Sequence, residues 1–90
     1  MRRARVRVHG RVQGVFFRAE ARARAESLGV GGWIRNEPDG SVTALFEGEP
    51  ERVASMIDWC RRGPGGAHVD EVEVSEEPGA APRGPGFRVL

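Results

Sequence analysis

The sequence predicts a single α+β domain in which two helices cover one face of an antiparallel sheet. Three observations support this prediction: polar and apolar residues alternate in several short segments, apolar residues recur at helical spacing in two longer segments, and glycine or proline separates them. A chain of 90 residues has room for one modest core, so residues 1–90 are expected to form one unit.

The first strand is expected around residues 5–9, where charged and apolar side chains alternate. A helix is expected over residues 17–28, and Gly29 is expected to end it. The apolar residues of this helix fall on one face: Phe17, Ala21, Ala25 and Leu28.

Residues 30–48 are expected to form a β-hairpin around Pro38-Asp39-Gly40, because proline presets one φ and glycine accepts a positive φ. A second helix is expected over residues 50–62, since Pro50 suits a first helical turn and Gly63 follows the last periodic residues. Its apolar face contains Val53, Met56, Ile57 and Cys60.

The last part of the chain is expected to add a strand near residues 71–74 and a short strand at residues 87–89. The Pro/Gly-rich residues 78–86 are expected to form a surface loop between them. Val69 is out of phase with the first of these strands, and Trp59 lies off its helix's apolar face, at an expected partly covered edge. The order β-α-β-β-α-β with a terminal strand is the split βαβ, or ferredoxin-like, pattern.

Residues 10–18, Gly-Arg-Val-Gln-Gly-Val-Phe-Phe-Arg, are the strongest candidate for a functional site. They lead from the first expected strand into the first expected helix. Backbone N–H groups in such a loop can converge on an anion, which the positive end of the helix favours. Arg18 adds a guanidinium that matches two phosphate oxygens. The segment therefore predicts a phosphate site.

Asn36, the only asparagine, ends the expected strand before the turn. Its side chain could bond the nearby backbone of the turn. Alternatively its amide, which both donates and accepts, could hold a water molecule in line with a bound phosphoryl group. Position in the sequence leaves both interpretations open.

The composition excludes several kinds of chemistry. All 14 basic residues are arginine, which excludes a lysine Schiff base and a Walker-type loop. Cys60 is the only cysteine and is expected in the core, so the sequence predicts no disulfide, no metal site and a cytoplasmic location. No segment reaches the roughly 20 apolar residues of a membrane span.

Three segments of the sequence resemble the acylphosphatase family: residues 10–18, residues 29–36 (Gly-Val-Gly-Gly-Trp-Ile-Arg-Asn) and residues 39–42 (Asp-Gly-Ser-Val). The similarity extends from Val6 to Val89. It implies a ferredoxin-like fold and hydrolysis of the carboxyl–phosphate bond of acyl phosphates to carboxylate and inorganic phosphate, without a metal or cofactor. The implied partner is a small-molecule acyl phosphate, and since nothing in the sequence indicates an oligomer, a monomer is expected.

The resemblance also implies a role for individual residues. Arg18 matches the family's phosphate-binding arginine, and Asn36 matches the asparagine that positions the attacking water. Ser41 stands where many members have threonine and is a candidate for an assisting hydroxyl. The backbone cradle for the phosphate is implied for Gln13, Gly14, Val15, Phe16 and Phe17.

Two alternatives have some support in the sequence. RNA-binding domains share the fold, and residues 2–7 are rich in arginine, but the first strand has no aromatic residue on which bases could stack. The arginines could instead attract an anionic substrate or form a solvated strand face. Acylphosphatase-like domains also occur within larger maturation proteins, where one could bind carbamoyl phosphate without turnover. The presence of both Arg18 and Asn36 favours an enzyme.

Overall fold

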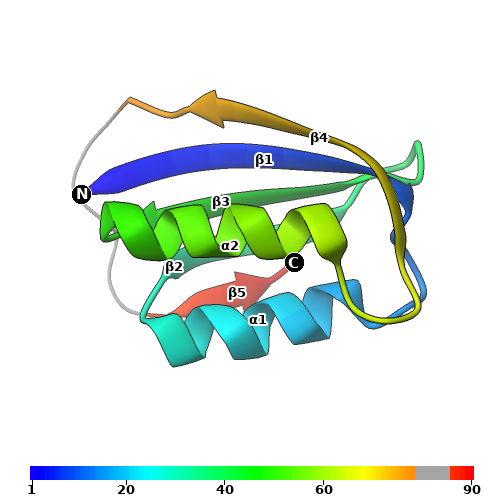
Figure 1. The fold of residues 1–90 in the computed structure, drawn as a ribbon, viewed down its shortest axis with the longest axis horizontal. Coiled ribbons are helices and arrows are strands. Elements are labelled where there is room, and N and C mark those ends of the chain that lie inside the picture. Colours follow the sequence, from blue (N-terminus) through cyan, green and yellow to red (C-terminus); the bar gives the residue numbers. More distant parts are fainter. Residues whose placement is uncertain (79–85) are drawn as a thin grey trace.

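The computed structural model describes residues 1–78 and 86–90, which form two helices on one face of a five-stranded sheet (Figure 1). The elements in chain order are β1 (Arg2–Arg11), α1 (Phe17–Leu28), β2 (Gly31–Asn36), β3 (Val42–Gly48), α2 (Pro50–Arg62), β4 (His68–Glu76) and β5 (Phe87–Val89). The strand order in the sheet is β4-β1-β3-β2-β5. The predicted ferredoxin-like arrangement is confirmed, and most of the predicted loop at residues 78–86 lies outside the described residues.

The sheet is mixed, which corrects the prediction of an antiparallel sheet. β1 pairs antiparallel with β3 and β4, and β2 pairs antiparallel with β3. β5 runs parallel to β2, with Gly32 opposite Phe87 and Ile34 opposite Val89. Alternation of apolar residues indicates that a strand exists, but it carries no information on which edge the strand joins or in which direction.

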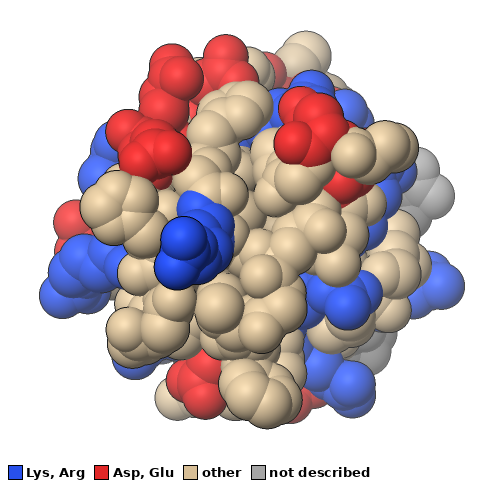
Figure 2. All heavy atoms as spheres, turned by 90° about the vertical axis from the view of Figure 1, so that its right-hand side faces the viewer, with Lys and Arg blue, Asp and Glu red and all other residues tan. Residues whose placement is uncertain are grey.

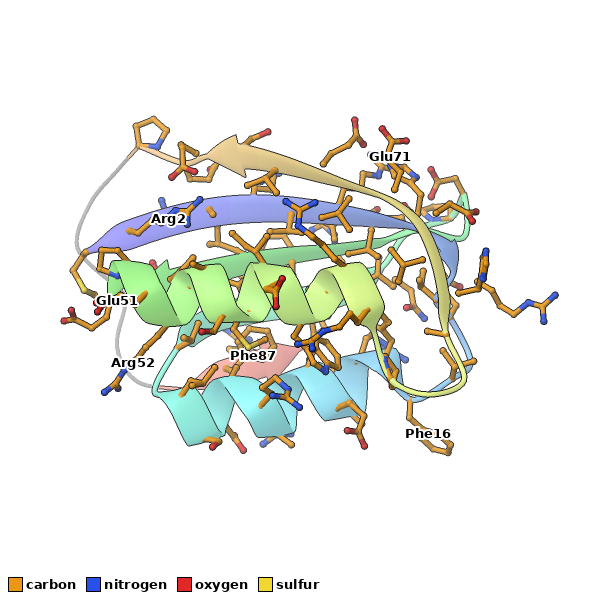
Figure 3. The ribbon with its side chains drawn as sticks, viewed as in Figure 1. Arg2, Phe16, Glu51, Arg52, Glu71 and Phe87 are labelled. Carbon is orange, nitrogen blue, oxygen red and sulfur yellow. The ribbon has the colours of Figure 1, made fainter. Side chains whose placement is uncertain are left out.

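The core lies between the sheet and the helices. It is formed by the apolar faces that the sequence patterns predict for the strands and helices. In β1 and β3 every second side chain points toward the helices, and the apolar faces of the two helices pack against these side chains. Phe87 of β5, labelled in Figure 3, is also buried and stacks on Phe46. The fully buried strand residues are Ala4, Val6 and Val8 of β1, Ile34 of β2, and Val42, Ala44 and Phe46 of β3.

Trp59 is buried, so the prediction of a partly covered edge is wrong. Only 5% of its surface is exposed. Its ring packs on Phe17 of α1 with 5.1 Å between the ring centroids, and the guanidinium of Arg24 lies 5.7 Å from its ring centroid. Trp59 thus fills the space between the two helices, and its burial depends on α1, which the pattern along α2 alone does not reveal.

A bulge in β4 explains why Val69 is out of phase with Val72. The register with β1 shifts just before Gly10, and Asp70 is the extra residue on β4. Val69 and Val72 therefore both pack against the core. Glycine is required at position 10, beside the bulge, because its φ is 132° and a Cβ there would lie 2.1 Å from the carbonyl oxygen of His68.

The arginines of β1 form a solvated strand face, which was one of the two interpretations of this segment. Arg3 pairs with Glu47 at 3.0 Å and Arg7 with Asp39 at 2.9 Å, and Arg5 also has a carboxylate partner. These partners come from β3, the turn before it and the residue that follows β4. The pairing reduces the excess positive charge of this face of the sheet.

Burial of Cys60 generates a prediction. Desolvation raises the pKa of the Cys60 thiol to about 12, so the group stays protonated at pH 8. A thiol-reactive disulfide such as Ellman's reagent should leave the folded protein unmodified at pH 8 and should titrate one thiol per chain in concentrated urea. Equally fast labelling of the folded and unfolded protein would contradict the burial of Cys60.

Candidate functional site

The loop between β1 and α1 lies at one end of the molecule, beside the β2–β3 turn and the α2–β4 connection (Figure 1). Two of its residues have left-handed backbone, Gly14 with φ 75° and Phe16 with φ 62°. Glycine adopts this conformation at little cost, whereas for Phe16 it costs about 1–2 kcal/mol. The Phe16 side chain is 79% exposed and projects away from the body of the protein (Figure 3), so its own packing does not explain this conformation.

Among the described residues, no side chain caps the N–H groups at the start of α1. Phe16 occupies the N-cap position, where serine, threonine, aspartate or asparagine is usual, and makes no side-chain hydrogen bond to the helix. In the described part of the chain, none of the N–H groups of residues 14–19 donates to a backbone carbonyl. These donors and the helix dipole together suit an anion.

The side chain of Gln13 attaches this loop to the β2–β3 turn. Its Nε2 donates to the carbonyl oxygens of Glu37 at 2.8 Å and Ser41 at 2.9 Å. Glu37 and Ser41 flank the turn and are joined by a backbone hydrogen bond of 2.8 Å. One side chain therefore holds the loop against both ends of the turn that follows Asn36.

A cavity of about 560 Å³ opens beside the loop, and both Arg18 and Asn36 line it. Figure 2 views the end of the molecule that carries the loop and the turn, where mostly uncharged surface surrounds one basic side chain near the centre and acidic groups gather above. The other residues that line the cavity are Val12, Gly14, Phe16, Phe17, Ala19, Arg22, Ala23, Glu26 and Val89. The structure thus brings together the predicted arginine, the predicted asparagine and part of the predicted loop.

Strand alternation and a hydrogen bond place the two polar side chains. Asn36 is the last residue of β2 and shares the inner face with the buried Ile34, so its side chain lies on the helix side of the sheet. This position favours the interpretation in which Asn36 serves the cavity rather than the turn. Arg18 Nη1 donates to the carbonyl oxygen of Leu90 at 3.1 Å, which directs the guanidinium along the end of β5.

The hydroxyl of Ser41 is engaged elsewhere. Its Oγ donates to Asp39 Oδ1 at 2.6 Å and accepts from Arg7 Nε at 3.0 Å. The Ser41 hydroxyl, together with its N–H, holds the pKa of the Asp39 carboxyl below its ordinary value. Ser41 does not line the cavity of Arg18 and Asn36, so the structure does not bring the predicted assisting hydroxyl to it.

The described residues contain neither a metal-binding cluster nor a membrane-spanning helix. Among residues 1–78 and 86–90, no three His, Cys, Asp or Glu side chains are grouped so that they could hold a metal ion. Neither of the described helices has the length and apolar character needed to span a membrane.

The acylphosphatase family model matches residues 4–89. The chain belongs to the acylphosphatase family. It is 60% identical over 77 residues to an acylphosphatase of Rubrobacter xylanophilus, covering 86% of this chain and 70% of that protein. It is 55% identical over 76 residues to an acylphosphatase of Syntrophobacter fumaroxidans, covering 84% and 78% of the two chains.

The fold agrees with the family. The structure superimposes on the crystal structure of an acylphosphatase from Bacillus subtilis with a TM-score of 0.92 at 30% identity, covering 100% of this chain and 99% of that one. The predicted family and fold are confirmed, and the chain is an acylphosphatase, an enzyme that hydrolyses acyl phosphates.

Sequence reasoning missed the side-chain role of Gln13 in this acylphosphatase. The resemblance assigned Gln13 only to the backbone cradle, and its partners lie 24 and 28 residues further along the chain. A carboxamide in a loop otherwise poor in polar groups was the only signal, and it does not identify its partners.

The attachment by Gln13 can be tested by replacing its side chain with that of alanine. Gln13→Ala removes two hydrogen bonds, while both carbonyl oxygens keep a backbone donor, the Gly40 N–H at Glu37 and the Glu37 N–H at Ser41. At about 0.5–1.5 kcal/mol for each bond lost, the free energy of unfolding should fall by about 1–3 kcal/mol in urea denaturation. Arg11→Ala, a change at the nearby exposed Arg11, serves as the control and should change stability by less than about 0.5 kcal/mol. Equal stability of the two variants would show that these hydrogen bonds contribute little.

Proposed function

We propose that this acylphosphatase binds the phosphoryl group of its substrate with Arg18 and the loop N–H groups, while Asn36 positions the attacking water. The observation that carries the proposal is the cavity shared by Arg18, Asn36 and the uncapped start of α1. The loop residues proposed to surround the phosphate are Gln13, Gly14, Val15, Phe16 and Phe17. The substrate is a small acyl phosphate, and no metal or cofactor takes part.

Binding of the phosphoryl group supplies the electrostatic part of catalysis. The planar guanidinium of Arg18 can donate two parallel hydrogen bonds to phosphate oxygens. The N–H groups of the loop meet the remaining equatorial oxygens, where charge is spread in the transition state. The dipole of α1 acts in the same direction, because its positive end faces the anion.

Asn36 supplies the nucleophile by orientation rather than by proton abstraction. Its carbonyl oxygen can accept a hydrogen bond from water and direct the water's lone pair at phosphorus. The new oxygen–phosphorus bond forms as the bond from phosphorus to the acyl oxygen breaks, and the carboxylate leaves with the electron pair. Because a carboxamide cannot take the proton of the water, that proton passes to an oxygen of the substrate's own phosphate.

The chemistry needs few other groups. A carboxylate is a good leaving group, so a general acid contributes little. Cys60 is buried in the core and is not available as a nucleophile. We assign Gln13 and Ser41 to supporting the loop and the turn, since their side-chain hydrogen bonds lie there.

The enzyme is further proposed to act as a monomer in the cytoplasm, with no nucleic acid partner. A single free cysteine suits a reducing compartment. One chain supplies all the polar groups proposed for the site, so a second copy is not required to complete the cavity. The arginines of β1 have carboxylate partners, which disfavours nucleic acid binding on that face.

Replacement of Arg18 tests the binding half of the site. With benzoyl phosphate in the presence of EDTA, Arg18→Gln should lower kcat/KM by about 10²-fold or more and abolish competitive inhibition by inorganic phosphate. Arg61→Gln, a change on the exposed side of α2, is the matched control and should behave as the unmodified protein. Loss of the unmodified enzyme's activity in EDTA would contradict the metal-free reaction.

Replacement of Asn36 tests the water-positioning half. Asn36→Ala should retain inhibition by inorganic phosphate at an unchanged concentration, because Arg18 and the loop remain. Its kcat should fall by about 10²-fold or more, because the water is no longer oriented. A folded Asn36→Ala enzyme with full kcat would show that Asn36 does not position the nucleophile.

A further inference from the structure

The cavity continues along α1 beyond the place proposed for the phosphate. Beyond Phe17 at its start, the residues of α1 that line the cavity are Arg18, Ala19, Arg22, Ala23 and Glu26. Their spacing puts them on one face of the helix over successive turns. The two alanines lie about 100° around the helix from the arginines that precede them, and their short side chains leave room beside the arginines. A phosphoryl group at the start of α1 would therefore leave this stretch for the acyl part of the substrate.

The lining of the cavity contains apolar residues as well as the charged residues of α1. Val12 and Val89 lie on the cavity wall, and Ala19 and Ala23 lie on the helix side. Such surfaces suit a short carbon chain. Arg22 is one helical turn, about 6 Å along the axis, beyond Arg18.

Arg22 has donors available for an anion. Its Nε donates to Glu26 Oε2 at 3.2 Å, which occupies one of the five N–H groups of a guanidinium. The pair is exposed, with 55% of the Arg22 side chain and 51% of the Glu26 side chain accessible. Exposed i, i+4 pairs of this kind are weak, so a substrate anion can share Arg22 with Glu26.

We propose that Arg22 makes this site selective for acyl phosphates whose acyl part ends in a second anionic group, such as a carboxylate one short carbon chain away. The inference rests on the proposed function, because it assigns the outer part of the same cavity. The phosphate lies at Arg18, the carbon chain passes beside the two alanines, and the terminal anion contacts Arg22. Glu26, one turn further on, sets the outer limit, because an anion that reaches past Arg22 meets its carboxylate.

Two substrates of equal chain length test this inference. Succinyl phosphate and butyryl phosphate both have four carbons in the acyl part. The acyl part ends in a carboxylate in succinyl phosphate and in a methyl group in butyryl phosphate. The unmodified enzyme should show a kcat/KM ratio of about 3 to 10 in favour of succinyl phosphate, mainly through a lower KM, and added salt should reduce this ratio. In Arg22→Gln the ratio should fall to about 1, whereas in Glu26→Gln it should rise, because the competing carboxylate is gone.

Arg24→Gln is the matched control, because Arg24 lies on the same helix and does not line the cavity. It should keep the ratio of the unmodified enzyme. A ratio that is the same in Arg22→Gln and in the unmodified enzyme, with butyryl phosphate still hydrolysed, would overturn the role of Arg22 and leave the proposed function intact. Failure of the unmodified enzyme to hydrolyse either substrate would overturn the proposed function itself.

Discussion

The proposed site depends on the two hydrogen bonds by which Gln13 attaches the β1–α1 loop to the β2–β3 turn. The loop contains left-handed backbone at Gly14 and at Phe16. In the described part of the chain, the N–H groups of residues 14–19 donate no hydrogen bond to a backbone carbonyl. A short segment with so few internal bonds needs an external attachment to keep one conformation. Because the turn follows Asn36 directly, the same side chain also fixes the phosphate-binding half of the site relative to the water-positioning half.

The rest of the fold supplies rigid supports for these two halves. β1 lies between β3 and β4, and its inward residues are fully buried, so the loop begins from a well-fixed strand. α1 is held on the sheet by its buried face and by the contact of Phe17 with Trp59. Strand alternation in β2 brings Asn36 to the helix side at the point where the strand ends. A cofactor-free hydrolase can work in this way because phosphoryl transfer to water requires mainly positioning and charge stabilisation.

Local patterns were sufficient to predict most of the fold, whereas contacts between distant segments were not. The bounds of α1 at residues 17–28 were predicted as observed, because four apolar residues share one helical face and Gly29 ends it. The burial of Trp59, the parallel direction of β5 and the side-chain partners of Gln13 all depend on segments distant in sequence, and no local signal specifies them. Arg18 and Asn36 were identified by resemblance to a family, and the structure adds that both line one cavity, while the hydroxyl of Ser41 lies outside it.

Hydrolysis of benzoyl phosphate in water labelled with oxygen-18 tests the central claim most directly. The claim is that the site holds the phosphoryl group and directs water at phosphorus. It predicts one labelled oxygen in each molecule of inorganic phosphate and unlabelled benzoate, as read from the isotope shift of the phosphorus resonance and the mass of the benzoate. Label in the carboxylate of benzoate, with unlabelled phosphate, would show attack at the carbonyl carbon and would contradict the proposed roles of Arg18 and Asn36.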